Sequence, residues 1–102
     1  MTSIVYKIVP AALWRASEAT GVFAGSPADA RDGFIHLSTA AQVPGTAARH
    51  FAGVEDLLLV AVSADGLDLR WEPSRGGDLF PHLYGELPHT SVLSIAPFRH
   101  SF

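Results

Sequence analysis

Three short segments alternate apolar and polar side chains, and this alternation limits the fold more than any other feature of the sequence. The segments are GFIHLS at 33–38, LDLRWE at 67–72 and FPHLY at 80–84. A period of two is typical of β-strands with one buried face, because successive side chains point to opposite sides. Gly, Pro and Asp residues between the segments favour turns. We therefore expect a sheet of short strands.

Other segments extend this pattern. Residues 4–9 and 92–98 are predicted strands, and DLLLVAVS at 56–63 is a continuous apolar strand that we expect to be buried on both faces. Strands combined with a few helices, and no detectable linker or repeat, predict one α+β domain over residues 1–102. The expected architecture is a mostly antiparallel, split sheet with two or three short helices.

The first helix is expected over residues 10–19. Pro10 suits a first helical turn, and Gly21 suits the left-handed position after a helix end. We expect Leu13 and Trp14 to face the core.

A second helix is expected after Thr39, because Thr39 and Gln42 match a capping box. Pro44 is expected to interrupt this helix, which would restart over 46–51. The stretch 21–33 is rich in Gly, Ser, Pro and Asp and is predicted to be a loop.

Composition and charge exclude several classes of function. The chain has no cysteine, so it can form no disulfide, thiolate metal site or cysteine nucleophile. Its net charge is −3 and its seven Lys and Arg residues are scattered along the sequence, which argues against a nucleic-acid surface. The longest apolar run, LLLVAV at 57–62, is too short to cross a bilayer, and the first residues lack a signal-peptide pattern. We expect a cytoplasmic monomer without a nucleic-acid or membrane partner.

The three alternating segments each place polar or ionisable side chains on one face. These side chains are His36 and Ser38 in the first segment, Arg70 and Glu72 in the second, and Phe80, His82 and Tyr84 in the third. If the three faces converge, they line one cleft.

The chemistry of this cleft would centre on His36, Glu72 and His82, which are the candidate catalytic residues. Imidazoles titrate near neutral pH, and a carboxylate is a suitable acid–base partner. The same three side chains could form a two-histidine, one-carboxylate metal set, but no HxH or HxxxH spacing supports it, and we expect no metal. A serine hydrolase is disfavoured because the sequence has no G-x-S-x-G motif.

Five further side chains are candidate ligand contacts. The Arg70 guanidinium can clamp a carboxylate or phosphate. The rings of Phe80 and Tyr84 can stack on a planar ligand group. Ser38 and Thr39 precede an expected helix, where backbone N–H groups favour an anion.

Each residue also has a purely structural explanation. His36 can be a core histidine that hydrogen-bonds a neighbour, and Arg70 and Glu72 can both face solvent. Thr39 can simply cap the helix, and Tyr84 can simply end a strand. The functional interpretation therefore depends on the polar side chains of all three segments taken together, and not on any one of them.

The stretches DGFIHLST, RWE and FPHLYG, with Gln42 and the strand DLLLVAV, resemble the bacterial domain-of-unknown-function family 952 along essentially the whole chain. Members of that family look like minimal ADP-ribosyltransferase folds, related to RNA 2′-phosphotransferases. The resemblance implies an NAD-like or nucleotide ligand in a cleft between two small sheets, with His36 as the first residue to carry over and Tyr84 as the ring that stacks on nicotinamide. A late catalytic glutamate of such transferases has no counterpart after Glu86.

Two functional hypotheses follow, with a structural role as a third. The first is a transferase or hydrolase that acts on NAD, as a substrate, or on a related phosphorylated nucleotide by ADP-ribosyl or phosphoryl transfer. The second is a non-catalytic domain that binds a small anion or nucleotide in the same cleft. In the third, the histidines only stabilise the fold and no ligand binds. No other cofactor is expected.

Overall fold

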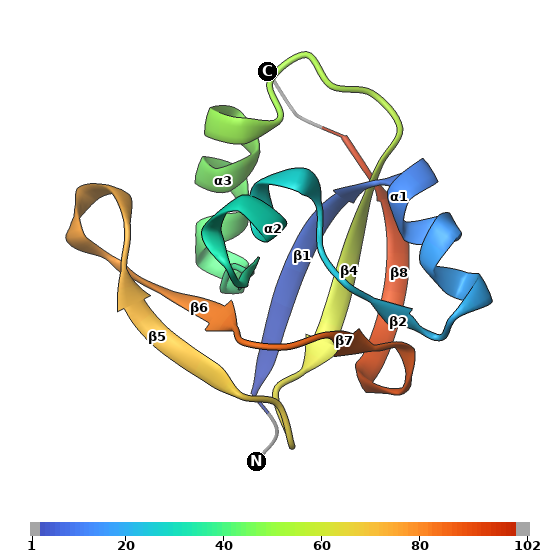
Figure 1. Cartoon of the computed structure of the whole chain (residues 1–102). Helices are drawn as coiled ribbons and strands as arrows, with labels where there is room; N and C mark the ends of the chain where they lie inside the picture. The colour runs from blue at the N-terminus through green and yellow to red at the C-terminus, as the bar shows by residue number, and fades with distance from the viewer. Residues whose placement is uncertain (1–2, 100–102) are drawn as a thin grey trace.

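The computed structural model describes residues 3–99, in which the strands form three antiparallel sheets (Figure 1). The main sheet has the order β1–β4–β8, with strands Ile4–Pro10, Leu57–Ser63 and Val92–Phe98. The second sheet has the order β3–β6–β5, with strands Ile35–His36, Leu79–Leu83 and Leu69–Pro73. The third pairs β2, Val22–Phe23, with β7, Leu87–Pro88.

Three α-helices lie between the strands. They are α1 (Ala11–Ala16), α2 (Pro27–Asp32) and α3 (Val43–His50). Short 3₁₀ turns are formed by Ser17–Ala19, Ala40–Gln42, Arg75–Gly77 and His89–Ser91. Figure 1 shows α2 and α3 beside β1, α1 near the opposite side of the main sheet, and the β5–β6 hairpin projecting away from it.

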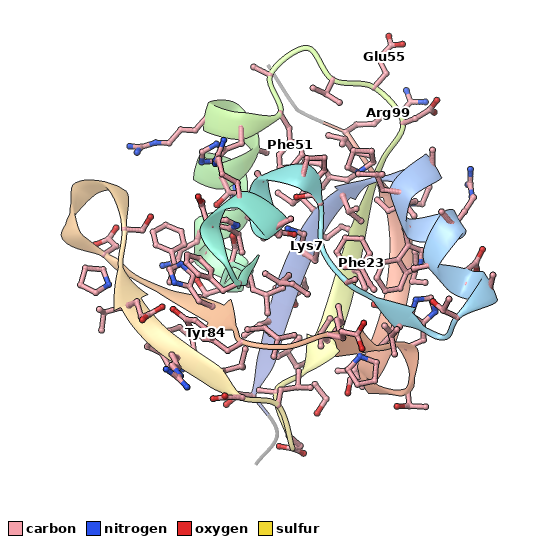
Figure 2. The ribbon with its side chains drawn as sticks, in the orientation of Figure 1. Lys7, Phe23, Phe51, Glu55, Tyr84 and Arg99 are labelled. Carbon is pink, nitrogen blue, oxygen red and sulfur yellow. The ribbon has the colours of Figure 1, made fainter. Side chains whose placement is uncertain are left out.

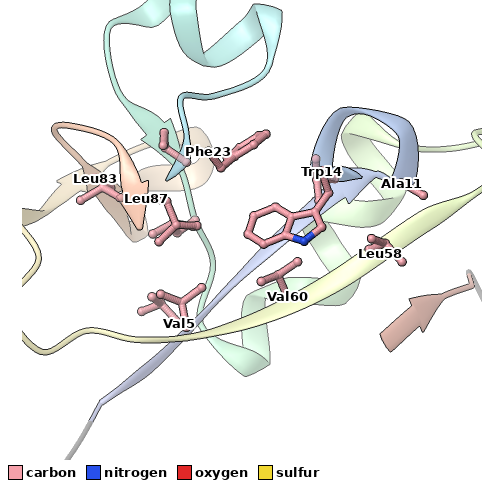
Figure 3. Close-up of a cluster of buried hydrophobic side chains, with 12 residues drawn as sticks. Val5, Ala11, Trp14, Phe23, Leu58, Val60, Leu83 and Leu87 are labelled. Atoms are coloured by element: carbon pink, nitrogen blue, oxygen red, sulfur yellow. The ribbon is translucent and has the colours of Figure 1, made fainter. Parts of the chain in front are cut away.

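The core forms on both faces of β4, the central strand of the main sheet. On one face, Leu58, Val60 and Val62 pack with the helix α1 and with residues of the two smaller sheets. Figure 3 shows the buried Trp14 indole within this cluster, over Leu58 and Val60. On the other face, Leu57 packs against α3. The prediction of a strand buried on both faces is confirmed, because both layers remove its apolar side chains from water.

The predicted loop at 21–33 was wrong, because it contains β2 and the helix α2. Ser26 is the N-cap of α2, Pro27 occupies its first turn, and Gly33 ends it with φ 85°. The Ser26 hydroxyl accepts a hydrogen bond from the Asp29 N–H, and the Asp29 carboxylate accepts one from the Ser26 N–H. This reciprocal capping box fixes the start of a helix that is only 6 residues long.

Prolines begin the helices and do not interrupt them. Pro44 lies in the first turn of α3, which starts at Val43, so the predicted break before 46–51 is wrong. Pro10 ends β1 and directly precedes α1. Trp14 is buried as predicted, but Leu13 is 37% exposed, because the short α1 turns only one side to the core.

The predicted fold class is confirmed as α+β with antiparallel sheets and three short helices. A backbone bridge between Tyr6 and Ser38 connects β1 to the segment that follows β3. No helix within residues 3–99 has the length and apolar character needed to span a bilayer. The bridge places the second sheet beside the edge of the main sheet, where the candidate site lies.

Candidate functional site

A pocket of about 900 Å³ lies between β1, β3, α2, α3 and the β5–β6 hairpin. Its volume falls within the range of about 300–1,000 Å³ that is usual for small-molecule sites. Of the predicted site residues, His36, Ser38, Phe80 and His82 line it. The segments that carry these residues are far apart in sequence and meet because β3 and β5 both pair with β6.

His36 is held by two aspartates of α2. Its Nδ1 lies 2.6 Å from Asp29 Oδ1, and its Nε2 lies 2.9 Å from Asp32 Oδ2. Both contacts are hydrogen bonds only if both ring nitrogens carry a proton, which is the charged form of imidazole. In that form both N–H groups of His36 face carboxylates, and no ring nitrogen is left to accept a proton.

Asp29 connects α2 to β1 and β3. Its side chain is 2% exposed, and it accepts hydrogen bonds from the backbone N–H groups of Ser26 and His36 as well as from the His36 ring. Burial alone would raise the pKa of Asp29, but the hydrogen bond from His36 and the charge of Lys7 together outweigh burial and hold it well below its usual range.

Lys7 forms a buried ion pair with Asp29. Its Nζ lies 3.0 Å from Asp29 Oδ2 and donates a hydrogen bond to the His36 carbonyl at 3.1 Å. Burial lowers the pKa of Lys7, and the Asp29 carboxylate partly offsets that effect. Figure 2 shows Lys7 in the middle of the molecule and Tyr84 out beside the β5–β6 hairpin. Lys7 thus ties the strand β1 to the helix that holds His36.

His82 is held by a carboxylate from the neighbouring strand. Its Nδ1 lies 2.8 Å from Glu72 Oε1, and the Tyr84 hydroxyl donates to the same oxygen at 2.7 Å. The hydrogen bonds from His82 and then from Tyr84 lower the pKa of Glu72, and the bond to Glu72 raises the pKa of Tyr84. The His82 side chain is only 7% exposed, and it lines the pocket.

Phe34 packs between the two histidines. Its ring stacks on His82 with centroids 4.0 Å apart and contacts His36 with centroids 4.6 Å apart. The two imidazoles lie 5.7 Å apart, centroid to centroid. Phe34 therefore restricts the orientation of both rings, and its role was not predicted.

Arg70, Glu72 and Tyr84 form an outer cluster that does not line the pocket within the described part of the chain. Arg70 lies over the Tyr84 ring at 4.4 Å from its centroid and contacts Asp68 at 3.5 Å. Its side chain is 59% exposed. The three predicted strand faces do meet, since β6 pairs with both β3 and β5, but the side chains of Arg70, Glu72 and Tyr84 are not part of the pocket lining. Their predicted catalytic and ligand roles stay predictions.

Ser38 and Thr39 differ in their relation to the pocket. Ser38 is buried in the pocket wall, where its hydroxyl shares a hydrogen bond with Thr46 at 2.9 Å. Thr39 is the N-cap of the 3₁₀ turn and forms the predicted capping box with Gln42. Gln42 also donates to the Leu79 carbonyl, which fixes this turn against β6. Thr39 lies outside the pocket lining, so its predicted anion contact also stays a prediction.

Basic side chains gather at the pocket although they are scattered in the sequence. Lys7, Arg31 and Arg49 line it, three of the seven Lys and Arg residues in a chain of net charge −3. The acidic side chains in the lining are Asp32 and Asp78, two of the ten Asp and Glu residues. Two of these cations are already paired, Lys7 with Asp29 at 3.0 Å and Arg31 with Asp32 at 3.1 Å, so Arg49 contributes most to any attraction for anions.

Among residues 3–99, no cluster of His, Asp and Glu side chains is arranged to hold a metal ion. The three side chains considered as metal ligands, His36, Glu72 and His82, have other partners. Glu72 accepts hydrogen bonds from His82 and Tyr84. The His36 ring contacts Asp29 and Asp32.

The structure therefore defines a small α+β fold with a ligand-sized pocket between two antiparallel sheets. Residues 8–95 match the family described as proteins of unknown function, DUF952. Because the match covers most of the chain, this protein belongs to that family. The predicted family membership is confirmed, whereas the likeness to ADP-ribosyltransferases stays a prediction.

Solved structures of one relative have the same fold. The crystal structure of protein CC0527 from Caulobacter crescentus is 48% identical, has a TM-score of 0.89, and the match covers 93% of this chain and 85% of that chain. The solution NMR structure of the same protein is 49% identical with a TM-score of 0.82, covering 92% of this chain and 83% of that chain. No curated protein matches the chain.

Proposed function

We propose that the protein binds NAD or a related phosphorylated nucleotide in the pocket lined by His36 and His82. The observation that carries this proposal is that two imidazoles, each bound at Nδ1 by a carboxylate, reach the wall of one ligand-sized pocket. Arg49 in the pocket lining supports an anionic ligand, whereas the charges of Lys7 and Arg31 are paired with Asp29 and Asp32. The resemblance to ADP-ribosyltransferases favours NAD over other anions.

The proposed reaction is ADP-ribosyl transfer. The bond between nicotinamide and the ribose C1′ breaks, a bond forms between C1′ and an acceptor oxygen, and nicotinamide leaves as a neutral base. The proton of the acceptor hydroxyl passes to Nε2 of His82, while Arg49 in the pocket lining stabilises negative charge on the ligand. In phosphoryl transfer the acceptor oxygen would bond to phosphorus, the P–O bond to the leaving oxygen would break, and His82 would take the acceptor's proton and return it to the leaving oxygen.

A non-catalytic binding domain is the second candidate. It is favoured by the position of Glu72, whose Oε1 already accepts hydrogen bonds from His82 and Tyr84 outside the pocket lining. The candidate carboxylate is thus engaged in supporting a histidine.

We also propose that the protein acts as a cytoplasmic monomer.

An NMR titration of the full chain tests this proposal. NAD, ADP-ribose and AMP are added while the ring and backbone signals of His36 and His82 are followed. We expect saturable shifts, and a several-fold weaker affinity for Arg49→Gln, because Arg49 lines the pocket. The matched control is Arg15→Gln, an exposed arginine outside this pocket.

The outcomes separate the three readings. Release of free nicotinamide from bound NAD supports the transferase, whereas binding without turnover supports the non-catalytic domain. If none of the three nucleotides shifts the histidine signals at millimolar concentration, the proposed function is refuted and a structural role for the two rings is favoured.

A further inference from the structure

We propose that Tyr84 and Glu72 are positioning residues that hold the neutral ring of His82 with its proton on Nδ1. The Nε2 lone pair then faces the pocket, and the ligand group bound beside it is an O–H or N–H donor. The statement about the ligand rests on the proposed function, but the statement about the ring does not.

The directions of the hydrogen bonds follow from the donor and acceptor inventory. An ionised carboxylate only accepts hydrogen bonds, so both groups that approach Glu72 Oε1 must donate. The Tyr84 hydroxyl donates at 2.7 Å, and His82 Nδ1 donates at 2.8 Å. Both hydrogen bonds lower the pKa of Glu72, which keeps the carboxylate ionised at neutral pH. The Tyr84 hydrogen bond therefore fixes Glu72 Oε1, the oxygen that accepts the hydrogen bond from His82 Nδ1.

The position of Nε2 follows from the same geometry. A neutral imidazole carries one proton, so a proton on Nδ1 leaves Nε2 as an acceptor. Nε2 has no hydrogen-bond partner among the groups that the structure describes, although His82 lines the pocket and its side chain is only 7% exposed. Stacking on Phe34, with centroids 4.0 Å apart and planes at 22°, fixes the tilt of the ring.

His36 provides the contrast within the same pocket. Both of its nitrogens contact aspartates, at 2.6 Å and 2.9 Å, so neither is available to a ligand donor. The two histidines therefore have different functions. Both nitrogens of His36 face the Asp29 and Asp32 carboxylates, whereas His82 presents an acceptor, so the matching ligand places an O–H or N–H donor at His82.

The ring state is tested without any ligand by ¹⁵N NMR of the full-length, labelled protein. Spectra are recorded at a pH where His82 is neutral, and the two ring nitrogens are distinguished by their chemical shifts. We expect Nδ1 to be protonated and Nε2 unprotonated in the wild type. Glu72→Ala should move the proton toward Nε2, and Tyr84→Phe, which keeps the ring, should give a smaller change in the same direction.

Glu86→Ala is the matched control, because it removes an exposed carboxylate close in sequence to Tyr84. It should leave both ring shifts of His82 unchanged. A wild-type His82 with its proton on Nε2 overturns the proposal. So does a Glu72→Ala protein that is folded and keeps the wild-type ring shifts. Should Glu72→Ala not fold, unchanged shifts in Tyr84→Phe refute the part of the proposal that concerns Tyr84.

A second measurement links the ring to ligand binding. The Kd for NAD is compared between wild type and Tyr84→Phe, which does not alter the pocket lining itself. We expect about a tenfold loss, the equivalent of roughly one hydrogen bond. An unchanged Kd refutes the positioning role. If NAD does not bind the wild type at all, the proposed function fails, while the ¹⁵N measurement still decides the state of His82.

Discussion

Replacing Asp29 by Asn should destabilise the protein more than replacing its partner Lys7 by Met. Asn is nearly the same size as Asp but retains one oxygen, so it can accept only one of the two backbone hydrogen bonds, which Ser26 donates to Oδ2 and His36 donates to Oδ1. It removes the charge opposite Lys7, whose side chain is only 6% exposed and whose other contact is the His36 carbonyl. The variant therefore leaves a buried ammonium group without a counter-charge.

The two variants should differ in stability because Lys7 and Asp29 retain different numbers of hydrogen bonds when the other partner is removed. Removing one member of a buried ion pair costs about 3–5 kcal/mol when the remaining charge is uncompensated. We expect a loss of this size for Asp29→Asn, against a total free energy of unfolding of about 5–15 kcal/mol for a domain of this kind. In Lys7→Met, Asp29 keeps the His36 ring and two backbone N–H donors, so we expect a loss of about 1–3 kcal/mol.

Urea denaturation at pH 7 provides the assay, with fluorescence of the buried Trp14 as the signal. Glu86→Gln, at an exposed carboxylate, serves as the control and should stay close to the wild type. A loss of less than about 1 kcal/mol for Asp29→Asn, or a larger loss for Lys7→Met, would show that the uncompensated Lys7 charge does not dominate. An unchanged m-value is required for the comparison to be valid.

Three further predictions follow from the described contacts. The pKa of Asp29 is lowered in the folded state, so its ionised carboxylate stabilises the fold at pH values above the ordinary carboxyl pKa of 3.8. This contribution is lost as the pH falls through the folded pKa. Acid titration followed by circular dichroism should therefore show a flatter loss of structure for Asp29→Asn than for the wild type below about pH 4. Gly25→Ala should lower the free energy of unfolding, measured in urea, by about 1–3 kcal/mol, because Gly25 has φ +114° and a Cβ there would lie 2.9 Å from the Asp29 Cβ. The control is Gly45→Ala, at a position in α3 where a Cβ would extend into open space. It should be neutral or raise the free energy of unfolding by up to about 1 kcal/mol. His89→Ala should cost about 1–3 kcal/mol, since the ring stacks on Trp14 at 4.4 Å and hydrogen-bonds Ser17 at 2.8 Å; a midpoint equal to the wild type would exclude a structural role for this histidine.

The alternation of side chains predicted the three converging strand faces because it is a local property of each strand. His36 and His82 are register partners in β3 and β6, and Arg70 lies opposite His82 in β5. The alternation of side chains does not show which members of a shared face will line a pocket, because that depends on the other elements packed against the sheet. Glu72 and Tyr84 therefore share the face with His82 but lie outside the pocket lining.

The residues that hold His36 were missed because the helix that carries them was predicted to be a loop. The signal was present: Ser26 as N-cap, Pro27 in the first turn, Asp29 at the capping-box position and Gly33 after the end. Gly and Pro density suggested a loop, although in this short helix they mark its two ends. Lys7 could not be recognised in this way, since its burial depends on an aspartate 22 positions away in the sequence.

The position of Asp29 has a consequence for the motions of this protein. The same carboxylate caps the start of α2, pairs with Lys7 and fixes the His36 ring. Unwinding of the first turn of α2 must therefore release the histidine, so the helix and this wall of the pocket open in one step. Any ligand that binds the held form of His36 should slow hydrogen exchange at the amides of α2, including those that it does not touch.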